Sequence, residues 1–455
     1  MPMATAGPLQ LVAAAAIGIV VLGVLIVVRK VPAFVALLVA SLAIALVAQF
    51  PDLDARSILQ SMQDGMAGTL GFVAVVVGLG AMFGQLLEVS GGAEVLATRM
   101  LAGFGERRAS WAMGLAGFVI AIPVFFDVGF VLLVPLLHGL ARRTGKPLLA
   151  FAAPALAGLA VAHAFVPPTP GPMAVASLLD APIGLVIVFG VAAGLPAMIV
   201  AGPLFGRFAA ARIPGVLVEA PDAPEMREDP PSLATVAGLL ALPIVLILGH
   251  TWALAAIAGR DEVAPLLEVV ILVGHPFVAL LVTTLACFRL LGTRRGWSRE
   301  RVHDLATKAL EPAGIVILVT GAGGVLKQVL IDTQVGRALA EPLAASDVSP
   351  IVLAFVLAAT VRVLQGSATV AMLTAAGLLV PLLEPVQPSP HLRALLVVAI
   401  ASGATVGSHV NDSGFWLVSR YLGLDVGQTL RSWTVLTTIL GCVGGAVALL
   451  LGALS

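Results

Sequence analysis

The sequence predicts an all-α polytopic membrane protein built from two inverted-topology repeats. Of its 455 residues, 59% are hydrophobic and only 11% are charged, and the mean hydropathy is +1.07. Apolar runs of about 20 residues, the length at which a helix crosses a bilayer, recur along the whole chain. The formal net charge is zero, which gives no indication of a nucleic-acid partner. Composition alone therefore predicts a protein that crosses the membrane many times.

An internal repeat at an offset of 243 residues is the second observation. Phe-Val-Ala-Leu-Leu-Val occurs at 34–39 and recurs without change at 277–282. A chain rich in Ala, Leu and Val can show one such match by coincidence, but other matches share the same register without gaps. These are Gly71 with Gly314, Gly78 with Gly321, Gly80 with Gly323, Gln85 with Gln328, Leu96 with Leu339 and Gly171 with Gly414.

The charges of the loops supply the third observation. Basic residues in short loops mark the cytoplasmic side of a membrane. The first half is basic at 29–30 and 142–146 and acidic at 51–56. In the second half the counterpart of the acidic loop is basic (294–301), and the counterpart of 142–146 carries a single Arg. Corresponding loops thus lie on opposite sides, as in inverted repeats whose substrate site lies near the bilayer midplane. Both termini are expected outside.

The first repeat is expected to cover residues 9–206. Its first apolar run has basic residues after it rather than before it, the reverse of a signal peptide, so it is expected to be a membrane span. The expected elements are spans at 9–28, 31–50 and 69–88, an amphipathic segment at 52–66, a charged arm at 91–107, a Pro-interrupted hairpin at 109–141, a broken helix at 147–180 and a span at 182–206.

A polar, Pro-rich linker at 207–232 separates this repeat from the second, at 233–452. Five crossings in each half give ten full spans plus two re-entrant hairpins, with tips near Asp127 and Ser367. The expected elements of the second repeat are spans at 233–252, 264–291 and 312–330, an amphipathic segment at 297–310, an arm at 332–348, a hairpin at 349–384, a broken helix at 394–422 and a span at 428–452.

The most polar stretch inside this apolar chain is 408–416, Ser-His-Val-Asn-Asp-Ser-Gly-Phe-Trp, which follows the apolar run 394–405. Polar and ionisable residues are costly in hydrocarbon and normally face a cavity or a partner. Gly403, Gly407 and Gly414 favour a locally unwound helix. Unwound backbone at membrane depth is tolerated where it lines a water-filled site, so this stretch is predicted to form half of a substrate site.

The 243-residue offset pairs this stretch with the Pro-rich break at 166–172. The hairpin tips at 122–129 and 362–369 would add hydroxyls, amides and free backbone N–H groups. The N-termini of half-helices carry partial positive charge and suit an anion. The residues predicted to contact the substrate are Arg362, Gly366, Ser367, Thr369, Asn411, Asp412, Ser413, Gly414, Pro168, Thr169, Gly171 and Asp127.

Several of these residues also have a structural interpretation. The prolines at 167–172 could simply end a helix. Ser367 and Thr369 could bond their own helix backbone. His409 could be a hydrogen-bonded structural histidine or a proton carrier.

The charged residues inside apolar runs leave a similar choice. Asp127 could lie at an interface, although the apolar runs that flank it favour a buried role. Lys327 could snorkel or pair with Asp332 rather than contact the substrate. His163 looks structural or interfacial. Arg362 is the better partner for a substrate carboxylate because a planar guanidinium matches that group.

No other class of chemistry is indicated, and the chain is not expected to be an enzyme. Ser408, His409 and Asp412 include catalytic residue types, but no nucleophile-elbow pattern supports hydrolysis. No metal-ligand spacing, cofactor motif or ATP-binding motif occurs. The two cysteines, Cys287 and Cys442, lie in apolar runs and imply no disulfide framework.

A set of motifs supports a family resemblance over essentially the whole chain. They are Gly321–Gly324, Lys327–Leu330, Arg362 with Gln365–Ala371, Ser408–Trp416 with Ser432–Thr434, Phe125–Phe130 and His163–Pro172. With these motifs the sequence resembles the gluconate permease family of proton symporters, within the ion-transporter superfamily of inverted-repeat carriers. One position departs from the family pattern: Pro-Pro-His-Pro is replaced by Pro-Pro-Thr-Pro at 167–170, which bears on the substrate more than on the fold.

The resemblance implies import of gluconate or a similar small hydroxylated carboxylate, driven by protons, across the bacterial inner membrane. Similar proteins handle other sugar acids or D-serine, so a symporter for D-serine or another small hydroxy acid or amino acid is the alternative. The resemblance also implies a homodimer in membrane lipid, with a scaffold and a moving portion that carries the hairpins, an elevator-type arrangement. A passive anion channel is the alternative class, since sequence alone does not separate a carrier from a leak.

The proton carrier is expected among Asp412, Asp127 and His409, with Asp412 favoured. An unpaired carboxyl in a low-dielectric cavity holds a proton more readily, and an arriving carboxylate favours that proton further. A nearby cation such as Arg362 or Lys327 would oppose this effect. The distance between the two charges decides which effect wins.

The inverted repeat predicts which loops face the cytoplasm. In a cysteine-free background, single cysteines at Arg142 and at Arg295 should react with a membrane-impermeant thiol reagent from the cytoplasmic side. A cysteine at Asp52 should react from the outside. Labelling of Asp52 and Arg295 from the same side would contradict the inverted-repeat interpretation.

Overall fold

The computed structural model describes residues 7–49, 53–213, 230–257, 264–335, 338, 348–383 and 387–454, and within these ranges the ordered elements are all helical. The predicted all-α class is therefore confirmed. Among these described residues, eight helical stretches are long and apolar enough to cross a membrane, and one of them, Leu149–Leu178, is interrupted at 166–169. The expected number of full spans was ten. Two of the expected crossings correspond to α2 and α19, which have 17 and 16 residues.

The N-terminal helices include one that is longer than the sequence suggested. The amphipathic segment at 52–66 and the span at 69–88 were expected as separate elements, but they form one continuous 35-residue helix, α3. Gly65 and Gly68 allow this because a glycine inside a helix costs only about 1 kcal/mol and does not force a break. Asp54 caps the helix by accepting from the backbone N–H groups of Arg56 and Ser57. The helices are α1 (Pro8–Gly23), α2 (Ala33–Gln49) and α3 (Ala55–Val89).

The rest of the first half follows the expected order. A short helix α4 replaces the arm, two helices separated by residues 121–125 form the first hairpin, and two helices separated by residues 166–169 form the first broken helix. The helical stretch after α9 continues to Arg212, so the linker begins later than residue 207, and 214–229 lie outside the described residues. The helices are α4 (Gly92–Phe104), α5 (Ala109–Ile120), α6 (Phe126–Thr144), α7 (Leu149–Phe165), α8 (Pro170–Leu178), α9 (Ile183–Ile199) and α10 (Phe205–Arg212).

The second half begins with a departure from the expected pattern. The predicted span at 264–291 is broken at His275, which has extended backbone (φ −56°, ψ 132°). Pro276 explains the break, because a proline disfavours helical backbone in the residue before it. The first helices of this half are α11 (Leu233–Ile257), α12 (Pro265–Gly274), α13 (Pro276–Cys287), α14 (Arg299–Lys308) and α15 (Leu310–Asp332).

The C-terminal elements again form a hairpin and a broken helix. Most of the predicted arm at 332–348 lies outside the described residues. A π-helical turn, η6, leads directly into the last helix, and such turns are frequent at functional sites. The elements are α17 (Pro350–Gln365), α18 (Ala368–Leu383), α19 (Pro390–Thr405), α20 (Ser413–Leu422), α21 (Val426–Thr429), η6 (Leu430–Thr434) and α22 (Val435–Leu454).

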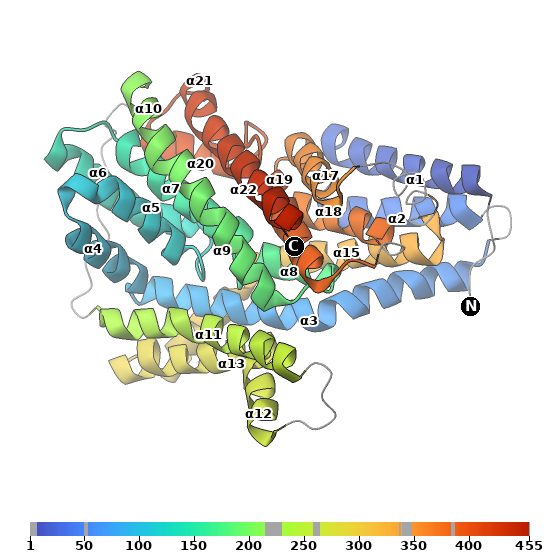
Figure 1. Ribbon diagram of the computed structural model, residues 1–455, viewed down its shortest axis with the longest axis horizontal. Coiled ribbons are helices and arrows are strands. Elements are labelled where there is room, and N and C mark those ends of the chain that lie inside the picture. Colours follow the sequence, from blue (N-terminus) through green and yellow to red (C-terminus); the bar gives the residue numbers. More distant parts are fainter. Residues whose placement is uncertain are drawn as a thin grey trace.

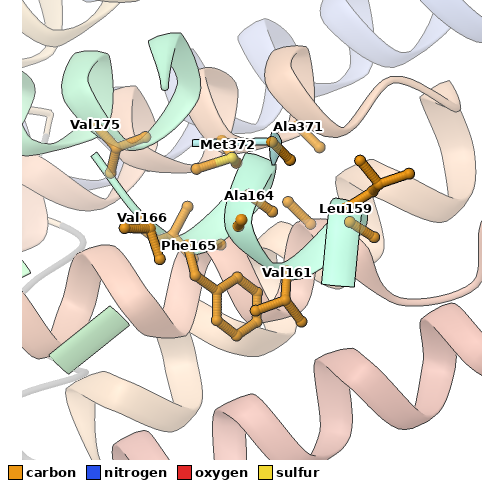
Figure 2. Close-up of a cluster of buried hydrophobic side chains, with 14 of the residues drawn as sticks. Leu159, Val161, Ala164, Phe165, Val166, Val175, Ala371 and Met372 are labelled. Carbon is orange, nitrogen blue, oxygen red and sulfur yellow. The ribbon is translucent and has the colours of Figure 1, made fainter. Parts of the chain in front are cut away.

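Helix α3 runs along the length of the molecule (Figure 1). Helices α11, α12 and α13 lie on one side of it, and both hairpins and both broken helices lie on the other. Figure 2 shows the interior where the first broken helix meets α18: Phe165 and Val166 at the end of α7 lie in one cluster with Val175 of α8 and Met372 of α18. These apolar contacts hold the break in α7–α8 against the second hairpin.

Small residues allow the closest helix crossing of the first half. Helix α5 crosses α7 where Gly114 and Gly158 meet, and a Cβ atom on Gly158 would lie 2.0 Å from the Gly114 carbonyl oxygen. Membrane helices gain no hydrophobic driving force against one another, so close backbone approach through small residues stabilises their packing. This crossing fixes the first hairpin to the first broken helix.

The variant Gly158→Ala should therefore destabilise the protein by about 1–3 kcal/mol, the usual cost of overpacking. Gly139→Ala in α6 is the matched control, because no atom lies within 4 Å of a Cβ placed there. The measurement is the apparent melting temperature of the purified protein in detergent. Equal melting temperatures for the two variants would contradict the assigned crossing.

Candidate functional site

Four helix N-termini line one cavity of ≈530 Å³. Phe126 and Asp127 come from the start of α6, Pro170 from α8, Ala368 and Thr369 from α18, and Ser413 and Gly414 from α20. Pro312, Ile315, Val316 and Val319 of α15 form an apolar wall. Both hairpins and both broken helices therefore contribute to one site, as the sequence predicted for its two pairs of interrupted segments.

The turn of the second hairpin depends on Gly366. Its φ of +94° is a conformation that side chains rarely adopt, and a Cβ atom there would lie 2.3 Å from the carbonyl oxygen of Asn411. The hairpin turn thus lies directly against the break between α19 and α20. Ser367 Oγ accepts from the backbone N–H of Val370 at 3.4 Å, so this hydroxyl bonds its own helix, one of the two interpretations that the sequence allowed.

A buried ion pair joins the hairpin to the break. Arg362 Nη2 lies 2.5 Å from Asp412 Oδ2, and the two side chains are only 4% and 13% exposed. Arg362 Nη1 donates to the Gly366 carbonyl, and Asp412 Oδ1 accepts from the backbone N–H of Gly414 at 3.1 Å. Both terminal nitrogens of the guanidinium are therefore bound within the protein. Arg362 lines the cavity. Because both terminal nitrogens bind protein groups, its guanidinium joins the hairpin to the break and is not free to bind a substrate carboxylate with two nitrogens.

Ser408 connects this ion pair to the last helix. Its hydroxyl donates to Asp412 Oδ2 and accepts from Trp433 Nε1 at 2.6 Å. Its carbonyl accepts from Thr434 Oγ1 at 2.5 Å, and its N–H donates to Thr437 Oγ1 at 3.2 Å. Because every polar group of Ser408 is bound, the unwound backbone after α19 is held at a fixed position.

The remaining polar residues of this break bind the end of α17. His409 Nε2 and Asn411 Nδ2 each donate to the Val363 carbonyl, both at 3.0 Å. This geometry supports the structural interpretation of His409. Asn411 still lines the cavity, as do Ser413 and Thr369.

The first half contributes Asp127 and His163 to the cavity. Asp127 lies in the first turn of α6 and is exposed to the cavity. The His163 ring lies 6.0 Å from the ring of Phe125, and the Phe126 ring lies 5.3 Å from that of Trp433. Aromatic rings from both halves thus close the cavity around its polar groups.

Three predicted contact residues of the first break lie elsewhere. Pro168 and Thr169 line a small pocket beside α3 that adjoins the large cavity, with Phe125, His163 and Pro170 lining both. Thr169 Oγ1 donates to the Val166 carbonyl at 2.7 Å. Gly171 faces Met372, since a Cβ atom there would lie 3.1 Å from its sulfur. The structure therefore brings Pro170, rather than these three residues, to the large cavity.

Lys327 lines a different cavity, of ≈430 Å³, between α3, α8 and α15. Its Nζ donates to the Leu178 carbonyl at 3.0 Å. Its positive charge there interacts favourably with the negative end of the α8 dipole. The expected partner Asp332 is instead bound by Gln328, at 2.8 Å. Lys327 therefore has a structural contact and is not a neighbour of Asp412 in this cavity.

Sequence reasoning did not assign the cavity residues His163, Gln365, Trp433, Thr405 and Thr437. A signal existed for His163, because it is the one ionisable residue in the apolar run 149–165, and such residues are usually functional at membrane depth. The signal for Trp433 was its place in the Ser432–Thr434 motif of the family resemblance. Its role follows from the contact with Ser408, which no spacing in the sequence reveals.

The arrangement can bind an anion without a metal. The first backbone N–H groups of a helix have no partner within that helix, and four such helix ends face the cavity. A helix N-terminus attracts an anion through these donors and through its dipole. Asp127 adds a carboxyl to the same cavity.

Comparison with known proteins gives a consistent result over the full length. The sequence matches the profile of the GntP family permeases over residues 9–454. It is 43% identical to the low-affinity gluconate transporter of Escherichia coli K12, with 96% of this chain and 97% of the relative covered. It is 41% identical to the inner membrane permease YgbN of the same organism, with 94% and 95% covered.

One solved structure is similar in fold. The YdaH transporter of Alcanivorax borkumensis, whose topology is described as unusual, superposes with a TM-score of 0.65. The match covers 92% of this chain and 97% of the other at 18% identity. At that identity the likeness concerns the fold alone.

The ion pair generates a stability prediction. Arg362→Gln should leave Asp412 as an unpaired buried charge and destabilise the protein by about 3–5 kcal/mol. Adding Asp412→Asn should restore much of that loss, because neither charge then remains. The apparent melting temperatures of the two single variants and the double variant form a cycle, with the exposed Arg420→Gln as the control. Additive losses in the double variant would contradict the direct pairing.

Proposed function

The chain belongs to the GntP permease family, and we propose that it imports gluconate or a similar small hydroxylated carboxylate together with protons. As a member of this family it is a multi-pass membrane transporter and not an enzyme. One of its relatives is named an inner membrane permease. The observation that carries the proposal is the convergence on a single cavity of four helix N-termini and of Asp127, a carboxyl that lies outside the Arg362–Asp412 ion pair.

The cavity suits a small polar anion. Its volume of ≈530 Å³ lies within the range of about 300–1,000 Å³ typical of small-molecule sites. The helix ends favour a carboxylate, and Thr369, Ser413 and Asn411 offer hydrogen bonds to hydroxyl groups. The name of the 43% identical relative supports gluconate as the first candidate.

Asp127 is the better candidate for the proton carrier. The sequence favoured Asp412, on the condition that no cation lies near it. In the structure Arg362 lies 2.5 Å from this carboxyl, so that condition is not met. Asp412 also accepts from Ser408 and Gly414, so three protein groups hold this carboxyl in place. His409 donates to a backbone carbonyl. We therefore assign the coupling proton to Asp127.

Magnitudes support this coupling. A helix N-terminus stabilises the charged form of Asp127 by about 0.3–1 kcal/mol at an exposed site. A substrate carboxylate about 5 Å away would repel it by roughly 3 kcal/mol at an effective dielectric constant of 20. The repulsion is the larger effect, so binding of the anion favours protonation of Asp127.

An elevator-type movement is the proposed route across the membrane. The first hairpin and broken helix (α5–α8) and the second pair (α17–α20) occur in the same order in each half, which supports an internal repeat. The cavity lies between these elements and α15, so the hairpins and broken helices form the proposed moving portion. We include a homodimer in the proposal, since the family resemblance implies one.

The experiment uses the full chain in proteoliposomes with radiolabelled gluconate. The wild type should saturate, exchange substrate by counterflow and accumulate it when the outside is acidified. Asp127→Asn, which mimics the protonated carboxyl, should keep counterflow but lose most of the accumulation driven by the pH gradient. Asp180→Asn, a carboxylate of the other cavity, is the control and should behave as the wild type does.

Each contrary outcome has a defined meaning. Flux that does not saturate and shows no counterflow would identify a passive channel instead. Transport of D-serine in preference to gluconate would select the alternative substrate. Continued accumulation by Asp127→Asn in response to acid would remove Asp127 as the carrier.

A further inference from the structure

We propose that His163 and Gln365 recognise the hydroxyl groups of the substrate and set the preference for polyhydroxylated carboxylates over short ones. The proposal rests on the proposed function and extends it to two residues that the sequence did not assign to the substrate site. The proposal is argued from two buried polar atoms that have no hydrogen-bond partner within the described residues. One atom comes from each half of the chain, and both residues line the same cavity.

Unpaired buried polar atoms are few in the part of the chain that the structure describes. Six buried side-chain nitrogen or oxygen atoms there lack a hydrogen-bond partner, and three of them belong to residues of the large cavity. Buried polar groups in proteins are nearly always satisfied, so each exception requires an explanation. The three cavity residues are His163 (Nδ1), Gln365 (Oε1) and Arg362 (Nε).

Arg362 differs from the other two. Its two terminal nitrogens already bind the Gly366 carbonyl and Asp412, so the side chain has a structural role without a ligand. No hydrogen bond within the described residues gives a comparable role to the unpaired atoms of His163 and Gln365. A bound molecule that supplies their partners is the simplest explanation for two such atoms in one cavity.

The positions of the two residues indicate what that molecule must offer. His163 lies on α7 beside Phe125 at the first hairpin, and Gln365 is the last residue of α17, directly before the turn of the second hairpin. A ligand that satisfies both contacts both hairpins. It must do so while its carboxylate occupies the helix N-termini, so it needs hydrogen-bonding groups beyond the carboxylate.

Hydroxyl groups fit both atoms. A hydroxyl donates to the amide oxygen of Gln365, and it can either donate to or accept from the imidazole nitrogen, depending on the tautomer. An acid with several hydroxyls can reach both residues. An acid with one hydroxyl, such as glycolate, has a single O–H for two residues that lie at different hairpins. The geometry therefore links selectivity to the number of hydroxyl groups on the substrate.

The chain offers matched controls for each residue. His138 Nδ1 and Thr374 Oγ1 are also buried without a partner among the described residues, but neither residue lines the cavity. His138 lies on α6 and Thr374 on α18, the helices that begin at the two hairpin turns. Variants there remove an unpaired buried atom without changing the proposed recognition.

The test measures binding and uptake of gluconate and of glycolate by the full-length protein. His163→Leu and Gln365→Met should each raise the KM and Kd for gluconate about tenfold, the usual effect of losing one hydrogen bond with its partner left unsatisfied. The affinity for glycolate, measured by competition, should fall less. His163→Asn keeps a polar atom near the Nδ1 position and should restore gluconate binding, whereas His138→Leu and Thr374→Val should leave the ratio of the two affinities unchanged.

Two outcomes would overturn the proposal. The first is wild-type affinity for gluconate in both His163→Leu and Gln365→Met. The second is an equal loss for gluconate and glycolate, which would place these residues at the carboxylate. If His163→Leu does not fold, His163→Gln moves the polar atom toward the Nε2 position and gives the same comparison. Failure of the wild type to take up gluconate would instead contradict the proposed function.

Discussion

The site depends on the buried ion pair between Arg362 and Asp412. Two charges removed from water are stabilising only when their remaining donors and acceptors are also satisfied. Here the Gly366 carbonyl, the Ser408 hydroxyl and the Gly414 N–H complete that set. The pair therefore joins the hairpin turn to the break between α19 and α20, and Trp433 extends the connection to the last helix through Ser408.

Because these two charges are paired, other groups determine the electrostatic potential of the cavity. Because Arg362 and Asp412 neutralise each other, the attraction for an anion comes mainly from the helix N-termini, which are fixed by backbone geometry. Asp127 is the carboxyl of the cavity that lies outside this ion pair. In the proposed mechanism the two carboxyls therefore have separate roles, Asp412 as the charged partner of Arg362 and Asp127 as the proton carrier.

The sequence predicted the helix breaks well because prolines and glycines act locally. The Pro-rich segment at 166–172 and the glycines around 408–414 disrupt helices whatever surrounds them, and the structure has breaks at both places. Long-range contacts could not be predicted in the same way. The distance from Arg362 to Asp412, the inward turn of the Thr169 hydroxyl and the contact of Lys327 with Leu178 all depend on packing between distant segments. The two elements that differ from expectation have local explanations: the glycines of α3 do not force a break, and Pro276 breaks a run that looked continuous.

The two halves resemble each other in helix order but differ in how their polar groups are used. In the second half the side chains of Ser408, His409 and Asp412 are bound to other protein groups, so that break is a fixed frame. In the first half the break is built from prolines, and Thr169 bonds its own turn. The groups of the first half that remain directed to the cavity are Asp127 and His163. The second half thus fixes its broken helix through side-chain contacts, while both halves contribute polar side chains to the cavity.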